Sequence, residues 1–147
     1  MDALWLVLAS AAGACIAVQA AANGSLRTQL DDPRYAAFFS ICGTIATAVL
    51  VMAALRPPLP STAAIRSAAW WNWIGGPLGA VIVLSGATLA PRLGAATFIS
   101  AVVAGQLVCS LLLDHFGLMN LPQQGLSFGR LLGAILVFCG VLLVRFR

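Results

Sequence analysis

Amides within long apolar stretches are the groups of this sequence that could bind a ligand. Gln19 and Asn23 lie one helical turn apart at the end of the first apolar stretch, and Gln106 lies past the middle of a later one. A polar side chain in such surroundings needs a partner or a cavity, and a carboxamide can both donate and accept hydrogen bonds. We expect Gln106 either to hydrogen-bond to a neighbouring helix or to line a substrate pathway. For Gln19, which is nearer the end of its stretch, a structural role is favoured over substrate binding.

Asp114 and His115 are the second candidate, because a histidine titrates near neutral pH. The two residues either mark the water boundary of an apolar stretch or form a pair that couples protons. As sequence neighbours at a helix end, they cannot form the nucleophile, base and orienting acid of a hydrolase. No phosphate-loop pattern occurs either, and we expect no enzymatic activity and no catalytic residues.

The four cysteines all lie within apolar stretches and show no CxxC or Cys/His spacing. Cysteine is often buried as a small apolar residue. We therefore expect neither a metal site nor another cofactor.

Composition places these residues in a membrane. Of the side chains, 61% are hydrophobic and 8% are charged, whereas a soluble domain has about 25% charged residues. The eight basic residues are all arginines scattered singly along the chain. Nucleic-acid binding requires a clustered basic face, so nucleic acid is excluded as a partner and the lipid bilayer is favoured.

The elements that position the polar groups are five apolar stretches. A helix needs about 20 residues to cross the hydrocarbon core, and a backbone in lipid must satisfy its own hydrogen bonds. The sequence thus predicts an all-α membrane protein with a single transmembrane domain. Its first stretch lacks a positive amino-terminal region and is expected to be a helix, not a signal peptide. The expected helices are residues 3–22, 35–55, 73–90, 94–113 and 128–144.

An odd number of spans places the two termini on opposite sides. Three arginines then accompany the amino terminus and five the carboxyl terminus. The excess favours a cytoplasmic carboxyl terminus, and a count this close to balance is also typical of a chain that inserts in both orientations.

Glycine pairs four residues apart let helix backbones approach closely in lipid. Gly75 and Gly79 form one pair and Gly129 and Gly133 another, with Gly140 two turns further on. We expect these glycines at helix contacts within one chain or between two chains.

Tryptophans gather at the start of the third expected helix, at positions 70, 71 and 73. They form either an aromatic belt at the lipid headgroups or a cation–π wall for a substrate. Pro77, after Gly75-Gly76, is expected to bend this helix.

Several segments together resemble the YdcZ-like family, five-helix proteins of the drug/metabolite transporter superfamily. The segments are Gln19–Arg27, Trp70–Gly76, Ala90–Thr97, Ala104–Leu107 and Ser110–Gly117, in that order. The matching positions of interest are Gln19, Asn23, Trp71, Gly75, Gly105, Gln106, Asp114 and His115.

The resemblance implies a bacterial inner-membrane protein that is half of a ten-helix inverted-repeat architecture. It implies an antiparallel homodimer or a pair with a sister five-helix subunit, and transport of small organic molecules whose identity it does not give. On this basis Gln19, Asn23, Trp71 and Gln106 are expected to bind substrate, and Asp114 and His115 to couple protons. The alternatives are a membrane scaffold or accessory subunit that binds lipid or a partner protein without transport, and a lipid carrier.

Overall fold

The computed structural model describes residues 2–146; Met1 and Arg147, the latter included in the arginine count above, lie outside this range. Within it, five helices are long and apolar enough to cross a membrane, and no strand occurs. The predicted all-α fold with five membrane helices is confirmed. The spans are Ala3–Leu30, Pro33–Leu55, Trp70–Leu93, Ala95–Phe116 and Phe128–Phe146.

Helix α1, Asp2–Leu30, is two turns longer than expected, because the polar Asn23-Gly24-Ser25 segment does not end it. Thr28 Oγ1 donates to the carbonyls of Gly24 and Ser25, at 3.1 and 2.8 Å. The Thr28 hydroxyl is thus satisfied by its own helix and needs no other partner.

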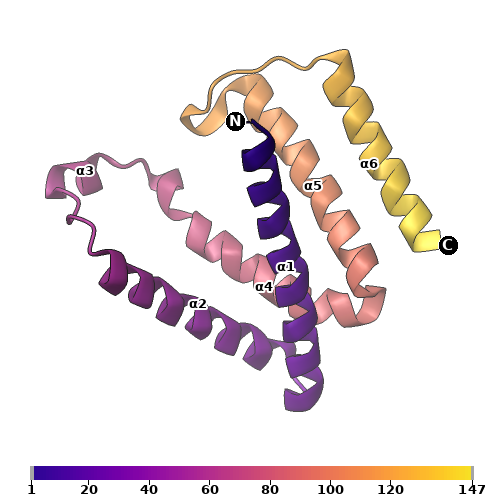
Figure 1. Cartoon of the computed structure of the whole chain (residues 1–147), viewed down its shortest axis with the longest axis horizontal. Helices are drawn as coiled ribbons and strands as arrows, with labels where there is room; N and C mark the ends of the chain where they lie inside the picture. The colour runs from indigo at the N-terminus through magenta and orange to yellow at the C-terminus, as the bar shows by residue number, and fades with distance from the viewer. Residues whose placement is uncertain (1, 147) are drawn as a thin grey trace. The chain divides into compact units, whose positions relative to one another are not determined.

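The turn after α1 is short, and the residues at positions 31 to 33 explain why one helix ends and the next begins. Asp31 adopts the left-handed conformation with φ of 58° and ends the helix. Asp32 then caps α2, Pro33–Leu55, by accepting the backbone N–H of Arg34 at 2.8 Å. Pro33 stands at the first helical position, where a missing N–H costs nothing. Helices α1 and α2 contact each other next to this turn, and α2 diverges from α1 at a wide angle (Figure 1).

Between the second and third spans lie a short helix α3, Thr62–Ser67, and a 3₁₀ turn η1, Trp70–Trp73, before α4, Gly75–Leu93. Pro77 falls in the first turn of α4, where proline is accommodated without a bend. The expected stop at Pro91 is not observed, since α4 continues to Leu93. The backbone N–H of Gly94 still reaches the carbonyl of Ala90 at 2.9 Å.

Helix α5, Ala95–Phe116, also runs one turn past its expected end at residue 113. Gly117, with φ of 59°, forms the left-handed cap that ends it. A 3₁₀ turn η2, Leu118–Asn120, and an extended connection lead to α6, Phe128–Phe146. Figure 1 shows α5 and α6 running side by side in opposite directions.

The chain divides into two compact units on either side of the Thr88–Leu89 bond. Few side chains are buried in either unit, and they are mainly small. In the first unit they include four alanines and Asn23; in the second they include Phe98 and two alanines. Large apolar side chains on all five spanning helices are exposed, as expected for a surface that lipid covers.

Candidate functional site

A cavity of about 560 Å³ lies in the first unit, among helices α1, α2 and α4. Its volume falls within the range of roughly 300–1,000 Å³ that is common for small-molecule sites. The wall is almost wholly aliphatic, and Gln19 and Thr44 are its polar side chains. The lining residues are Gln19, Ile41, Thr44, Ile45, Gly75, Gly76, Gly79, Ala80, Ile82 and Val83.

Two further polar residues, Asn23 and Ser40, lie one helical turn from the wall residues Gln19 and Thr44. The buried Asn23, 6% exposed, donates from Nδ2 to Ser40 Oγ across the α1–α2 contact at 3.1 Å. Thr44 Oγ1 donates to the carbonyl of Ser40 at 3.1 Å. Asn23 thus has a protein partner, whereas the Gln19 carboxamide has none within residues 2–146. Gln19, whose side chain is exposed, is the amide in the cavity wall without a protein partner among the described residues.

Ser40 was not identified from the sequence as a functional candidate. It lies one turn before Thr44 on α2, so a polar face of that helix was detectable. Its pairing with Asn23 was not, because the partner lies 17 residues away and is set by the way α1 and α2 meet.

Gly75 and Gly79 line the cavity. A Cβ atom added at either position would meet no atom within 4 Å. Within this chain the first glycine pair therefore leaves open space on α4, and a contact of these glycines with a second chain stays a prediction. The same open space surrounds Gly129, Gly133 and Gly140 on α6.

Trp71 precedes the first cavity-lining residue of α4, Gly75, by four positions in the sequence, but it does not line the cavity itself. It is half-buried in η1 and packs edge-on against Trp70, with ring centroids 5.8 Å apart. Its indole N–H is buried and has no hydrogen-bond partner within the described residues.

Asp114 and His115 lie at the end of α5 in the second unit, where they belong to a polar clasp. We use this name for Asp114, Gln123, Gln124 and Arg130, which join α5 to the start of α6 together with the His115 carbonyl. Arg130 donates to Asp114 Oδ2 at 3.1 Å and to Gln124 Oε1 at 2.6 Å. The Gln124 backbone N–H donates to the Asp114 carbonyl at 2.8 Å.

His115 contributes its backbone to this clasp, since Gln123 donates to its carbonyl at 2.9 Å. The imidazole packs edge-on against Phe116 at 4.8 Å, and its Nδ1 is buried without a partner among residues 2–146. The structure therefore pairs the Asp114 carboxylate with Arg130 and not with the neighbouring imidazole. The opposite charges on either side of a short connection were the sequence signal for this pair.

Gln106 lies on α5 with an exposed side chain and no hydrogen-bond partner in the described part of the chain. It is in the second unit, whereas Gln19, Asn23 and Trp71 are in the first. The four predicted substrate-binding residues thus do not gather at one site within either unit.

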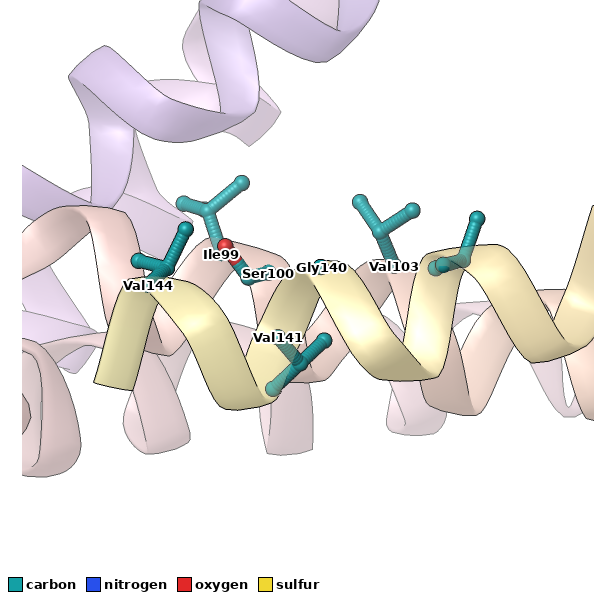
Figure 2. Close-up of a pocket in the computed structure, with 7 residues that line it drawn as sticks. Ile99, Ser100, Val103, Gly140, Val141 and Val144 are labelled. Atoms are coloured by element: carbon teal, nitrogen blue, oxygen red, sulfur yellow. The ribbon is translucent and has the colours of Figure 1, made fainter. Parts of the chain in front are cut away.

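A second hollow, of about 320 Å³, lies in the second unit between α5 and α6. Figure 2 shows Ile99, Val103 and Val144 pointing in the same direction, and Ser100 and Gly140 also line the hollow. Ser100 Oγ donates to the carbonyl of Ala96 at 2.7 Å, so its hydroxyl proton is already used. This hollow therefore has an apolar surface with no free hydrogen-bond donor to recognise a ligand.

Comparison with known proteins agrees with the residue-level resemblance. The family described as "Putative inner membrane exporter, YdcZ" matches residues 4–143. The chain is similar to "Inner membrane protein YdcZ" of Escherichia coli (strain K12), with 40% identity over 83 residues, which cover 56% of this chain. The match spans about half of that relative, 55% of its length. No solved structure matches the chain.

These findings confirm the predicted family and the predicted location in the bacterial inner membrane, which the protein crosses several times. The family description is that of an exporter, which favours a transport role over an enzymatic one. Because the match extends over nearly the whole sequence, the chain belongs to the YdcZ family of inner-membrane proteins.

Proposed function

We propose that the protein is a transporter of small organic molecules that works as an inverted homodimer. The observation that carries the transport proposal is the 560 Å³ cavity among three membrane helices, with one free amide in its wall. A family described as an exporter supports it. A scaffold that binds only a partner protein has no need of such a cavity, and the transport assay below distinguishes a transporter from a lipid-binding scaffold.

The transport proposal is tested in everted membrane vesicles from cells that produce the chain. Accumulated small molecules are compared by untargeted mass spectrometry with those in vesicles that contain the Gly79→Leu variant. We expect at least one compound to accumulate in the vesicles with the unaltered chain and not in those with the variant. If the two vesicle preparations accumulate the same compounds to the same level, the scaffold interpretation replaces the transporter.

Five spans per chain and a near balance of three against five arginines support the inverted pair. In such a pair one chain has its carboxyl terminus inside the cell and its partner has it outside. A carboxyl-terminal tag should therefore be accessible from both faces of the membrane. A single fixed orientation contradicts the inverted homodimer.

Proton coupling, where it occurs, is assigned to Asp114 and His115, because no acid lies near the middle of a spanning helix. Transport by the doubly neutral Asp114→Asn, His115→Gln protein should then lose its pH dependence. An unchanged pH profile would remove both residues from the coupling role.

A further inference from the structure

The wall of the α1–α2–α4 cavity has a distinctive composition. It contains no charged and no aromatic side chain among its ten lining residues, all of which lie in the described part of the chain. Its polar groups are the Gln19 carboxamide and the Thr44 hydroxyl, and the Thr44 proton is already donated to the Ser40 carbonyl. Gln19 is therefore the group with free donors as well as an acceptor.

This composition disfavours a charged ligand. Moving an ion out of water is costly unless an opposite charge and hydrogen bonds replace the water. A cation would need a carboxylate or the face of an aromatic ring, and neither lines the cavity. An anion would find only the partial positive charge at the start of α4, near Gly75 and Gly76, about half an elementary charge at most.

We infer that the cavity binds an uncharged, largely aliphatic molecule that carries one amide or hydroxyl group, which hydrogen-bonds to Gln19. This inference rests on the proposed function, since it names the substrate class of the same site. Gly79 sets the space for the aliphatic body, because its missing side chain leaves that part of the cavity open.

The test uses three probes that share one rigid aliphatic cage and differ in charge. They are 1-adamantanecarboxamide, 1-adamantyltrimethylammonium and 1-adamantanecarboxylate. Binding to the full chain in phosphatidylcholine nanodiscs is measured by equilibrium dialysis, with protein-free nanodiscs to correct for partitioning into lipid. We expect the amide to bind at least about tenfold more tightly than either ion.

Two glycine variants form a matched pair that tests the location. Gly79→Leu places a side chain in the cavity and should weaken binding of the amide at least about tenfold. Gly43→Leu, on α2, also places its side chain in open space but lies outside the cavity wall. It should bind the amide as the unaltered chain does. Retained helicity and elution volume show that each variant folds.

Gln19→Glu tests the polar contact by changing its charge. A carboxylate in the same place should weaken binding of the amide about tenfold or more and admit the ammonium probe. Gln19→Leu should weaken binding of the amide probe and should not allow the ammonium probe to bind.

Each remaining outcome separates this inference from the proposed function. Tighter binding of an ion, lost in Gly79→Leu, overturns the uncharged class and leaves the transporter intact. Binding of the amide that survives Gly79→Leu overturns the cavity as its site. Binding that depends on Gly79, without transport of any compound in vesicles, supports the inference and overturns the proposed function.

Discussion

Individual polar residues in the spanning helices differ in whether their own helix can satisfy them. Thr47 and Thr88 donate to carbonyls four residues earlier, at 2.9 and 2.8 Å. These hydroxyls are satisfied by their own helix, whereas neither Asn23 nor Gln19 bonds its own helix within the described residues. The amides therefore show the tertiary organisation: Asn23 has found a partner on α2, and Gln19 faces a cavity.

The bond between Asn23 and Ser40 should stabilise the α1–α2 contact. Asn23→Ala and Ser40→Ala should each destabilise the protein, and their coupling in a double-mutant cycle should be about 0.6 kcal/mol, as for polar contacts between other membrane helices. Unfolding by dodecyl sulfate in mixed micelles measures these free energies. Strict additivity, together with a loss of transport in Asn23→Ala alone, would instead assign Asn23 to the substrate.

Asp32 should titrate below the usual range for an aspartate. The Arg34 side chain donates hydrogen bonds to its carboxylate, the shortest at 2.6 Å, and the Arg34 backbone N–H donates another, and together they lower the pKa of Asp32. Its stabilising effect is thus complete above about pH 4, the usual value for a free aspartate. It is lost as the pH falls through the lower folded value.

The Asp32 carboxyl carbon, followed by NMR, should show this low midpoint. In Arg34→Gln the midpoint should rise, because the positive charge of the guanidinium and its short hydrogen bonds to the carboxylate are lost. A midpoint that does not change in this variant would rule out the Arg34 side chain as the main cause.

At the scale of helices, the five spans were predictable because hydrophobicity over about 20 residues decides them. Their ends were less so. Asn23-Gly24-Ser25 and Pro91 lie inside helices although both are typical helix-ending signals, whereas Asp31 and Gly117 end helices through left-handed backbone conformations. The cavity could not be predicted, since it depends on how the faces of α1, α2 and α4 meet. The sequence did provide two of its features, Gln19 and the Gly75–Gly79 pair.

The polar clasp should hold the α5–α6 connection in place. Both partners of its ion pair are about 30% exposed, with side-chain values of 31% for Arg130 and 29% for Asp114. We therefore expect a modest effect, about 0.5–1 kcal/mol. In Arg130→Gln, amide hydrogen exchange in residues 118–127 should accelerate a few-fold. The charge-reversed pair, Asp114→Arg with Arg130→Asp, should restore part of the protection, and a failure of either result would argue against the clasp.

For the whole molecule, one isolated chain leaves much of its apolar surface uncovered. Leu50, Leu84 and Leu136, on three different spanning helices, are 69%, 40% and 62% exposed. Lipid covers such side chains without penalty, so exposure alone does not identify a partner surface. The stronger argument for a pair is topological, because an inverted dimer requires both orientations of the same chain.

Orientation should therefore respond to a few arginines. Arg56→Ser with Arg66→Ser leaves 3 − 2 = 1 arginine on the amino-terminal side against five, which should fix the carboxyl terminus in the cytoplasm. Arg92→Ser, Arg145→Ser and Arg147→Ser with Leu59→Arg leave four arginines on the amino-terminal side against two, which should favour the opposite orientation. Leu59 is suited to this change because it is 91% exposed between two prolines. Tag accessibility measures both outcomes.

Each of these oriented variants should be inactive in the vesicle transport assay when produced alone, because it lacks a partner of the opposite orientation. Production of both in the same cells should restore transport, since the two then form the inverted pair. Full activity of one oriented variant by itself would contradict the inverted homodimer. That result would make the functional unit either a single five-helix chain or a pair in which both copies face the same way.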